Sequence, residues 1–331
     1  MERRQRAMHS DSGSIAVGLP LRKTVVNSLL RLKHWLLGTG MRTGVAGKAL
    51  VTLLLIDIGF VYLYPVLYMV STMMMTLNDL VDPTVIWVPT EICLENISIA
   101  FIGMEYMQGL AQSALVSIVG AVAQAFTCAL AGYGLSRYHF RGRNLVFAMV
   151  LLTFIVPPQT IIIPLFLLNR HLGWLNTNWA LVVPEMFGLG LKGALFVIIY
   201  RQFFLGLPSS LDEAARLDGA GGFAVFTRVM LPISKPAILV VSLFSVVWHW
   251  NDYYLPTMLV SDQKKWSLVR RLHGLGAALD EIYGVNEYGM SRFSEPIEMA
   301  GAFLVILPIL LLYLIAQRWF TESIERTGLV E

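Results

Sequence analysis

The chain has 331 residues, of which 56% are hydrophobic and only 14% are charged, and its mean hydropathy is +0.64. A soluble domain of this length does not need so much apolar surface, so the composition indicates that lipid surrounds most of the chain. The formal net charge of +3 is too small to indicate a nucleic-acid partner.

Residues 1–47 form a basic N-terminal extension. Residues 1–20 are polar and poor in large apolar side chains, which predicts disorder, and they lack the apolar core of a cleavable signal peptide. Residues 21–37 mix Lys and Arg with Val, Leu and Trp. Two interpretations of this second stretch stay open: a helix lying at the lipid interface, or a basic flank that only fixes topology.

Six apolar runs follow within residues 48–322, and each approaches the roughly 20 residues that a helix needs to cross a bilayer. They lie near 50–74, 110–135, 145–168, 181–203, 237–260 and 297–319. Helices are the expected spanning form, because backbone groups in lipid must bond within their own segment. Glu185 and Lys192 interrupt the fourth run, and Pro157-Pro158 should kink or break the third.

The distribution of Lys and Arg predicts the orientation. Residues 1–48 are rich in both, residues 75–109 contain neither, the next loop holds three Arg, and the third loop holds one. This alternation predicts a bacterial cytoplasmic-membrane protein whose termini, including the tail 323–331, are cytosolic. Residues 261–296 break the pattern with balanced charges of both signs. They are either an insertion that contacts a binding protein or a solvated variable loop.

A charged, helix-forming segment separates the fourth and fifth runs. Ser210 and Glu213 fit the N-cap and N3 positions of a capping box. Gly219 is the expected stop, because glycine tolerates the left-handed conformation after a helix. A second helix should cover 223–230 and end at Leu231-Pro232. The prediction is helix, glycine turn, helix, which by itself would also suit an ordinary hairpin between two spans.

The spacing of this segment, residues 204–236, resembles the EAA loop of ABC import permeases. The matching positions are Glu213-Ala214-Ala215, Gly219, Val229, Leu231 and Pro232, with Val229 in place of the commoner Ile. Further stretches follow the family's order, namely residues 131–144, Pro157-Pro158-Gln159, residues 172–177 and Trp250-Asn251-Asp252. Together they resemble the carbohydrate-uptake branch, the maltose-type permeases of the shorter six-span kind, over roughly residues 50–320.

The resemblance implies an all-α membrane protein with six transmembrane helices and a cytosolic helix-turn-helix coupling loop. The expected partners are a second homologous permease chain, two cytosolic ABC ATPase subunits, an extracellular solute-binding protein and membrane lipid. ATP and Mg would bind to the ATPase subunits, and this chain would hold no cofactor or metal and be no enzyme. Its Gly47-Lys48 lacks the Walker A pattern, because Arg42 and Ala49 occupy two required positions.

By the same resemblance, one set of residues would couple the chain to the ATPase. Glu213 would pair with a basic residue of the partner, Ala214 and Ala215 would allow close approach, and Gly219 would set the turn. The remaining members of this coupling set are Asp218, Leu231 and Pro232.

Polar and aromatic residues at membrane depth are the candidates for the solute path, because sugars need hydrogen-bonding groups and aromatic faces. They are Gln159, Trp248, Asn251 and Asp252. Helix-to-helix hydrogen bonding would explain each of them equally well. Lys192 is the only basic residue well inside a span, so we expect a neutral oligosaccharide or a similar polyol-rich solute.

The predicted function is therefore a permease subunit of an ATP-binding-cassette importer that moves a carbohydrate. An ion-coupled secondary transporter would need intramembrane carboxylates, for which Asp57 and Glu185 are candidates, but it leaves the EAA-like loop unexplained. A membrane-embedded enzyme would need a convergent set of catalytic groups, which the sequence does not present.

Overall fold

The computed structural model describes residues 38–39, 42–190, 192–284 and 292–328, and the chain divides into two units at Leu67. The disordered segment and the interfacial helix predicted within residues 1–37 lie outside the described residues. The regular secondary structure of the described residues is helical, except for two short strands. These are β1 (Gly38–Thr39) and β2 (Arg42–Thr43), an antiparallel pair in which Gly38 faces Thr43. The all-α class predicted from the sequence is confirmed.

The first unit contains most of α2 (Val45–Thr72), a helix of 28 residues. At 1.5 Å per residue it is about 42 Å long, more than the hydrocarbon core of a bilayer. Large apolar side chains are exposed along it on all sides. A helix that is hydrophobic all round is typical of a membrane span.

Three helices of the described chain are long and apolar enough to span a membrane unaided: α2, α5 (Tyr106–Arg137) and residues Glu295–Arg318 of α17 (Glu295–Gly328). Three further pairs of helices meet this condition only as bent pairs, so the number of spans reaches six when each pair is one span. The sequence predicted six runs with a kink or break in the third, and the structure interrupts the third, the fourth and the fifth.

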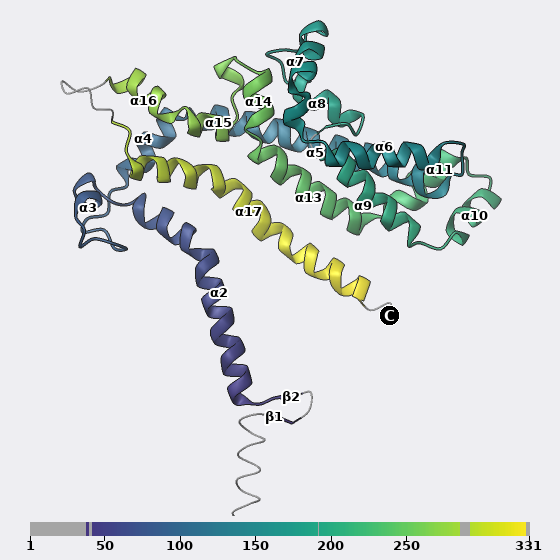
Figure 1. Cartoon of the computed structure of the whole chain (residues 1–331), viewed down its shortest axis with the longest axis horizontal. Coiled ribbons are helices and arrows are strands. Elements are labelled where there is room, and N and C mark those ends of the chain that lie inside the picture. The colour runs from purple at the N-terminus through teal and green to yellow at the C-terminus, as the bar shows by residue number, and fades with distance from the viewer. Residues whose placement is uncertain (1–37, 40–41, 191, 285–291, 329–331) are drawn as a thin grey trace, which may run out of the picture. The chain divides into compact units, whose positions relative to one another are not determined.

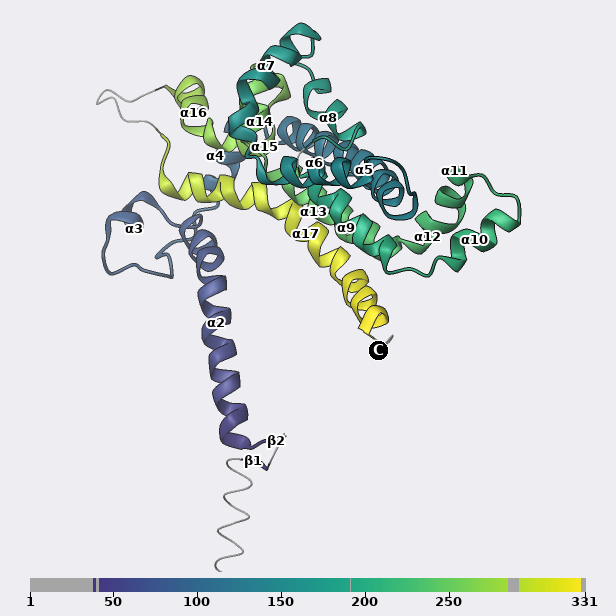
Figure 2. The same cartoon turned by 45° about the vertical axis from the view of Figure 1, so that its right-hand side comes forward.

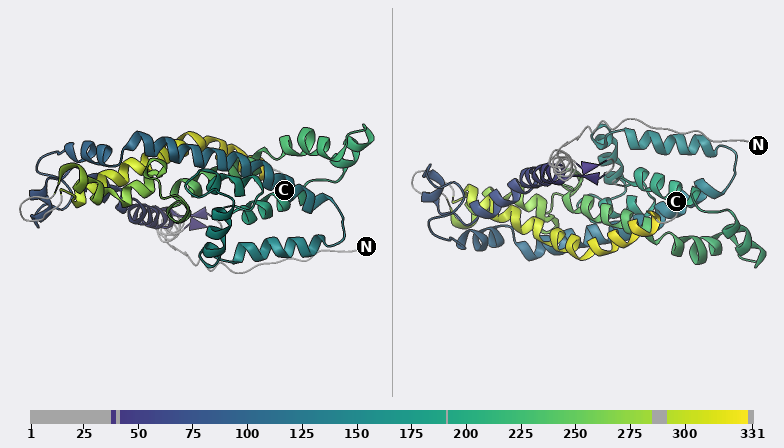
Figure 3. Two further views of the ribbon diagram at one scale, coloured as in Figure 1. Left: turned by 90° about the horizontal axis from the view of Figure 1, so that it is seen from above. Right: turned by 90° about the horizontal axis from the view of Figure 1, so that it is seen from below.

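The second unit is built around α5. This helix packs against α8 (Trp179–Met186), α9 (Gly193–Leu205) and α13 (Lys235–Asn251), which lie beside it in Figures 1 and 3. Gly132 allows α5 and α9 to approach each other closely, because a Cβ atom at this position would lie 2.7 Å from the Cβ of Tyr200 on α9. Small residues at such contacts are typical of helices that associate in lipid.

Two large apolar clusters lie at opposite ends of α5. The loop-end cluster surrounds Tyr133, Phe204, Phe226 and Met230, beside the segment that joins α9 to α13. The other cluster brings α5 together with α4 (Glu95–Gly103), α15 (Leu268–His273), α16 (Leu275–Tyr283) and α17.

The third predicted span is broken at Pro157-Pro158, as the sequence indicated. α6 (Arg143–Ile155) ends there, and η1 (Pro158–Ile161) and α7 (Ile162–His171) continue at an angle of 99°. Val156 and Pro157 both have extended backbone, which proline imposes on the residue before it.

The fourth and fifth predicted spans are each interrupted as well. Residues 187–192 separate α8 from α9, and Gly188 and Lys192 have positive φ there. Asp252 and Tyr253 separate α13 from α14 (Tyr254–Leu259), and Oδ1 of Asp252 accepts the backbone N–H groups of Tyr254 and Leu255 at 3.0 and 3.3 Å. The side chain thus caps the second helix, which explains why the fifth run is not continuous.

Residues 261–284 are folded rather than a solvated loop. They form η3 (Gln263–Lys265), α15 and α16, whose Leu268, Leu275 and Leu279 are fully buried. Arg271 is buried and forms an ion pair with Glu105 at the start of α5. Its guanidinium also donates to the carbonyl oxygens of Gln263 and Met104, which ties this segment to the end of α5.

The segment between α2 and α4 is also ordered by a carboxylate. In α3 (Leu77–Val81) the Asp79 carboxylate accepts the backbone N–H of Thr76 at 3.1 Å. Thr76 and Asp79 thus form a capping box at the start of this helix. The hydroxyl of Thr90 donates to the same carboxylate and lowers the pKa of Asp79, with the bonds from Thr76 adding to this effect and burial opposing it.

Candidate functional site

The segment between α9 and α13 forms the helix-turn-helix that the sequence predicted. α10 (Ser210–Leu217) is followed by a turn at Gly219 and then by α11 (Gly222–Val225), a π-helical turn (Phe226–Met230) and α12 (Leu231–Ile233). Figure 2 shows α10, α11 and α12 extending beyond the ends of α9 and α13. We call residues 206–234 the coupling loop.

Gly219 ends α10 as predicted. Its φ is +83°, its N–H bonds to the carbonyl oxygen of Arg216 at 3.0 Å, and the N–H of Ala220 bonds to that of Ala215 at 3.0 Å. These two bonds are the Schellman arrangement, which requires a left-handed residue at Gly219.

Two local predictions for this loop are wrong. Ser209, not Ser210, is the N-cap of α10, and its side chain makes no capping bond, so there is no capping box with Glu213. Pro232 does not end the second helix, because the helical backbone continues to Ile233. Pro232 lies in the first turn of α12, where proline's missing N–H costs nothing. The bend of 80° into α13 follows at Ser234.

The structure divides the predicted coupling residues into two groups. Glu213, Ala214, Asp218, Gly219 and Pro232 are exposed. Ala215 and Leu231 instead pack against the loop-end cluster, so their first role is to hold the loop together.

Two large apolar side chains share the exposed surface of the coupling loop, and the sequence analysis did not single them out. Leu217 is 88% exposed and Phe223 is 63% exposed. In a loop that leaves the membrane, such side chains are typical of a surface that a protein partner covers.

A buried carboxylate attaches α10 to the end of α5, and the sequence analysis missed this contact. Asp212 is only 7% exposed. Its Oδ1 accepts the Tyr133 hydroxyl at 2.9 Å, and its Oδ2 lies 3.2 Å from Nε of Arg137. The only sequence signal was the position of Asp212 on the apolar side of a short helix.

The candidates for the solute path are only partly brought together. Trp248, Asn251 and Asp252 lie at one end of α13, whereas Gln159 is exposed in η1, on another segment. Asn251 is exposed and donates to the carbonyl oxygen of Val247 in its own helix, and Asp252 caps α14. Local hydrogen bonds therefore account for both polar residues.

Trp248 belongs to an aromatic group beside the break in the fourth span. Its ring stacks on Phe244, with centroids 5.6 Å apart, and lies 5.5 Å from Phe196. Nζ of the exposed Lys192 lies 5.7 Å from the Trp248 centroid, within the range of a cation–π contact.

Four polar residues at membrane depth form one buried network between α5, α8 and α13. The Ser245 hydroxyl donates to Oε1 of Gln124 at 2.6 Å and lies 3.2 Å from Nδ1 of His249. Nε2 of His249 lies 3.0 Å from Oε1 of Glu185. A Cβ atom on Gly190 would lie 1.9 Å from the Glu185 carboxylate, so glycine is required beside the pair. We call this the membrane-depth network.

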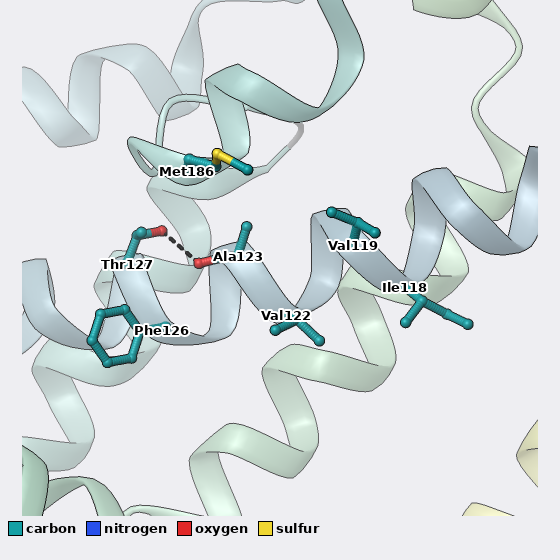
Figure 4. Close-up of a pocket in the computed structure, with 7 residues that line it drawn as sticks. All are labelled: Ile118, Val119, Val122, Ala123, Phe126, Thr127 and Met186. Atoms are coloured by element: carbon teal, nitrogen blue, oxygen red, sulfur yellow. Dashed lines mark hydrogen bonds between the residues drawn. The ribbon is translucent and has the colours of Figure 1, made fainter. Parts of the chain in front are cut away.

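An apolar pocket of about 520 Å³ lies between α5 and Met186 of α8 (Figure 4). It is lined by Ile118, Val119, Val122, Ala123, Phe126, Thr127 and Met186. Thr127 supplies the only hydroxyl of this lining, and its single hydrogen is shared by the backbone oxygens of Ala123 at 2.8 Å and Glu185 at 3.0 Å. A pocket without available polar groups is unsuited to a sugar.

Comparison with known sequences adds an independent observation. Residues 125–326 match the sequence family described as "Binding-protein-dependent transport system inner membrane component". This match covers the coupling loop and the whole membrane-depth network except Gln124.

Individual relatives align over most of the chain. The polygalacturonan/rhamnogalacturonan transport system permease protein YtcP of Bacillus subtilis is 29% identical over 262 residues, which cover 78% of this chain and 89% of that protein. The diacetylchitobiose uptake system permease protein NgcG of Streptomyces coelicolor is 31% identical, over 65% of this chain and 67% of the relative.

A solved structure shares the fold. It is the crystal structure of a bacterial ABC transporter involved in the import of the acidic polysaccharide alginate, with a TM-score of 0.65 and 23% identity. The alignment covers 82% of this chain and 96% of the compared chain.

Proposed function

The chain belongs to the family of inner-membrane components of binding-protein-dependent transport systems, and we propose that it is one permease subunit of an ABC importer for a carbohydrate. As a member of this family it is a multi-pass protein of the inner membrane and a transport subunit. Two relatives named for saccharide uptake support the proposed solute class, because they align with most of this chain.

The coupling loop is the observation that carries the mechanism. An importer of this kind must pass the energy of ATP hydrolysis from a cytosolic partner to the spans. Three kinds of contact for a protein partner lie on this one loop. Glu213 supplies an exposed negative charge, and the small side chain of Ala214 lets the partner's backbone approach closely. Leu217 and Phe223 supply exposed apolar surface. The left-handed turn at Gly219 sets the angle between the two halves of that loop.

We assign ATP and Mg to two cytosolic ATPase subunits, one of which receives the coupling loop of this chain in a cleft. A second permease chain and an extracellular solute-binding protein complete the proposed assembly. Closure of the ATPases on ATP would then switch the spans between inward-facing and outward-facing arrangements. The Lys and Arg alternation supports a cytosolic coupling loop and cytosolic termini.

The experiment is to purify the complex from its native host through a tag on this chain. We expect ATPase subunits to copurify, and we expect their ATP hydrolysis to rise when the solute-binding protein is loaded from a saccharide panel of neutral and acidic members. Amino acids, peptides and metal ions are the comparison set. Stimulation by one of these, with no response to any saccharide, would exclude the carbohydrate assignment and leave the ABC assignment standing.

A further inference from the structure

The carboxylate of Asp212 is buried although it stands next to the exposed Glu213 on the same short helix. It lies between the Tyr133 hydroxyl and the Arg137 guanidinium, both in the last turn and a half of α5. Arg137 also donates through Nη2 to the carbonyl oxygen of Leu207 at 2.8 Å, so it holds the chain that enters α10 as well. We call Tyr133, Arg137 and Asp212 the α5 anchor.

Stability alone does not explain this anchor. Removing a carboxylate and a guanidinium from water costs free energy that the attraction between them only partly returns, and apolar replacements of buried ion pairs are often as stable. The best-supported role of such a pair is to fix one particular arrangement of the parts it joins. Here the parts are the coupling loop and the second span.

The chain enters and leaves the loop through two bends. α10 meets α9 at a bend of 79°, and α12 meets α13 at a bend of 80°. Residues at such joints can absorb a rotation by changing their backbone angles. Motion of α10 therefore reaches the spans through side-chain contacts: the α5 anchor, and the loop-end cluster, which packs loop residues against α5 and α9.

α5 is suited to receive that motion. It is a continuous helix of 32 residues, and it carries Gln124 of the membrane-depth network. Through Ser245 and the His249–Glu185 pair, Gln124 is linked to α13 and to α8. A displacement of the Arg137 end of α5 thus reaches three helices at membrane depth through direct contacts.

Resting on the proposed function, we propose that Asp212 is a positioning residue: with Tyr133 and Arg137 it makes α10 and α5 move as one body when the ATPase moves the coupling loop. Glu213 and its exposed neighbours bind the partner, and Asp212 transmits the resulting motion of α10 to α5.

The test uses the whole complex in proteoliposomes, with Cys93→Ser and Cys128→Ala and one new cysteine, Met107→Cys, in the exposed first turn of α5. Two rates are measured: phosphate release from Mg-ATP, and maleimide labelling at position 107 with and without Mg-ATP and vanadate. In the unmutated anchor we expect vanadate trapping to change the labelling rate. In Asp212→Asn we expect ATPase subunits to copurify and hydrolyse ATP, while the change in labelling falls on the order of tenfold.

A double-mutant cycle separates a specific pair from general damage. Arg137→Gln should reduce the labelling change as Asp212→Asn does, and the double variant should lose no more than either single variant, because both remove the same contact. Tyr133→Phe removes one hydrogen bond and should give a smaller loss, which keeps the test decisive if Asp212→Asn does not assemble. Arg141→Gln, an exposed arginine four residues beyond Arg137, is the matched control and should behave as the unmutated chain.

Several results would overturn the anchor. One is an unchanged labelling response in Asp212→Asn and Tyr133→Phe; another is additive losses in the cycle; a third is no response at position 107 even with the intact anchor. Failure of the proposed function looks different, because no ATPase subunit would then copurify with the unmutated chain.

Discussion

At the residue scale, the coupling loop contains three kinds of position. Glu213 is an exposed carboxylate, Asp212 is a buried one, and Gly219 is a backbone position with φ of +83°. A substitution at each position should therefore impair transport for a different physical reason: loss of a partner contact at Glu213, loss of an internal anchor at Asp212, or strain in the turn at Gly219.

Glu213→Ala and Gly219→Val should both reach the membrane and both lose transport and stimulated ATP hydrolysis. Alanine removes the exposed charge, and valine at a left-handed position costs about 1–2 kcal/mol, which displaces α11 from α10. Gly221→Ala is the matched glycine control, because its φ is −66° and a Cβ atom there meets nothing within 4 Å. Uptake assays and copurification of the ATPase measure the effects; full transport in both variants would refute the docking role.

Asp79 makes a pH-dependent prediction for the segment between α2 and α4. Its pKa is lowered because Thr90 and Thr76 hydrogen-bond to the ionised carboxylate. The stabilisation is therefore complete above the ordinary pKa of about 4 and is lost as the pH falls through the lowered value. Hydrogen–deuterium exchange of residues 76–90, corrected for intrinsic rates, should stay slow at pH 5 and rise below about pH 4. In Asp79→Asn it should be fast at both, and equal protection in the two proteins would contradict this account.

At the element scale, three of the predicted spans are pairs of shorter helices. α9 and α13 have 13 and 17 residues, so at 1.5 Å per residue they are about 20 and 26 Å long, less than a hydrocarbon core of about 30 Å. Irregular backbone at membrane depth is tolerated only where protein or a water-filled path surrounds it. At the break between α8 and α9 only one side is enclosed: Glu185 of the membrane-depth network is buried, whereas Phe187 and Leu189 are 71% and 78% exposed.

This network gives a prediction for the fold of the spans. His249→Ala should destabilise the purified protein by about 3–5 kcal/mol, because it removes the buried imidazole that lies 3.0 Å from the Glu185 carboxylate. Glu185→Gln together with His249→Gln should cost less, since the site then holds no buried carboxylate. Asn251→Ala on the same helix is the control, because Asn251 is exposed and bonds only within α13. Thermal unfolding in detergent would show the order, and equal losses in the single and double variants would contradict it.

At the scale of the whole molecule, the orientation follows from the positions of Lys and Arg. The coupling loop and both termini should be cytosolic, whereas residues 79–105 and 264–295 should be outside. Single cysteines in a chain without Cys93 and Cys128 can be treated with an impermeant maleimide in intact cells. We expect labelling at Glu91→Cys and none at Ser210→Cys, and the reverse result would overturn the proposed topology. Ser210 is suitable because it is exposed in the first turn of α10.

The sequence by itself determined the features that depend on local chemistry. Runs of apolar residues predict helices in lipid, Pro157-Pro158 predicts the break in the third span, and the glycine at 219 predicts the end of α10. Each follows from the residues concerned, because hydrophobic burial, a missing N–H and a left-handed φ act within a few positions. The spacing around Glu213 also predicted the family, which the match over residues 125–326 confirmed.

Only the tertiary structure decided which polar residues meet. Asp212 and Glu213 are adjacent and chemically alike, yet one is paired with Tyr133 and Arg137, 75 or more positions earlier in the chain, and the other faces outward. Glu185, Ser245, His249 and Gln124 were separate polar positions in the sequence and became one network through the packing of α5, α8 and α13. Such contacts depend on how helices cross, and that geometry is set by the packing of side chains from distant segments, which no local pattern encodes.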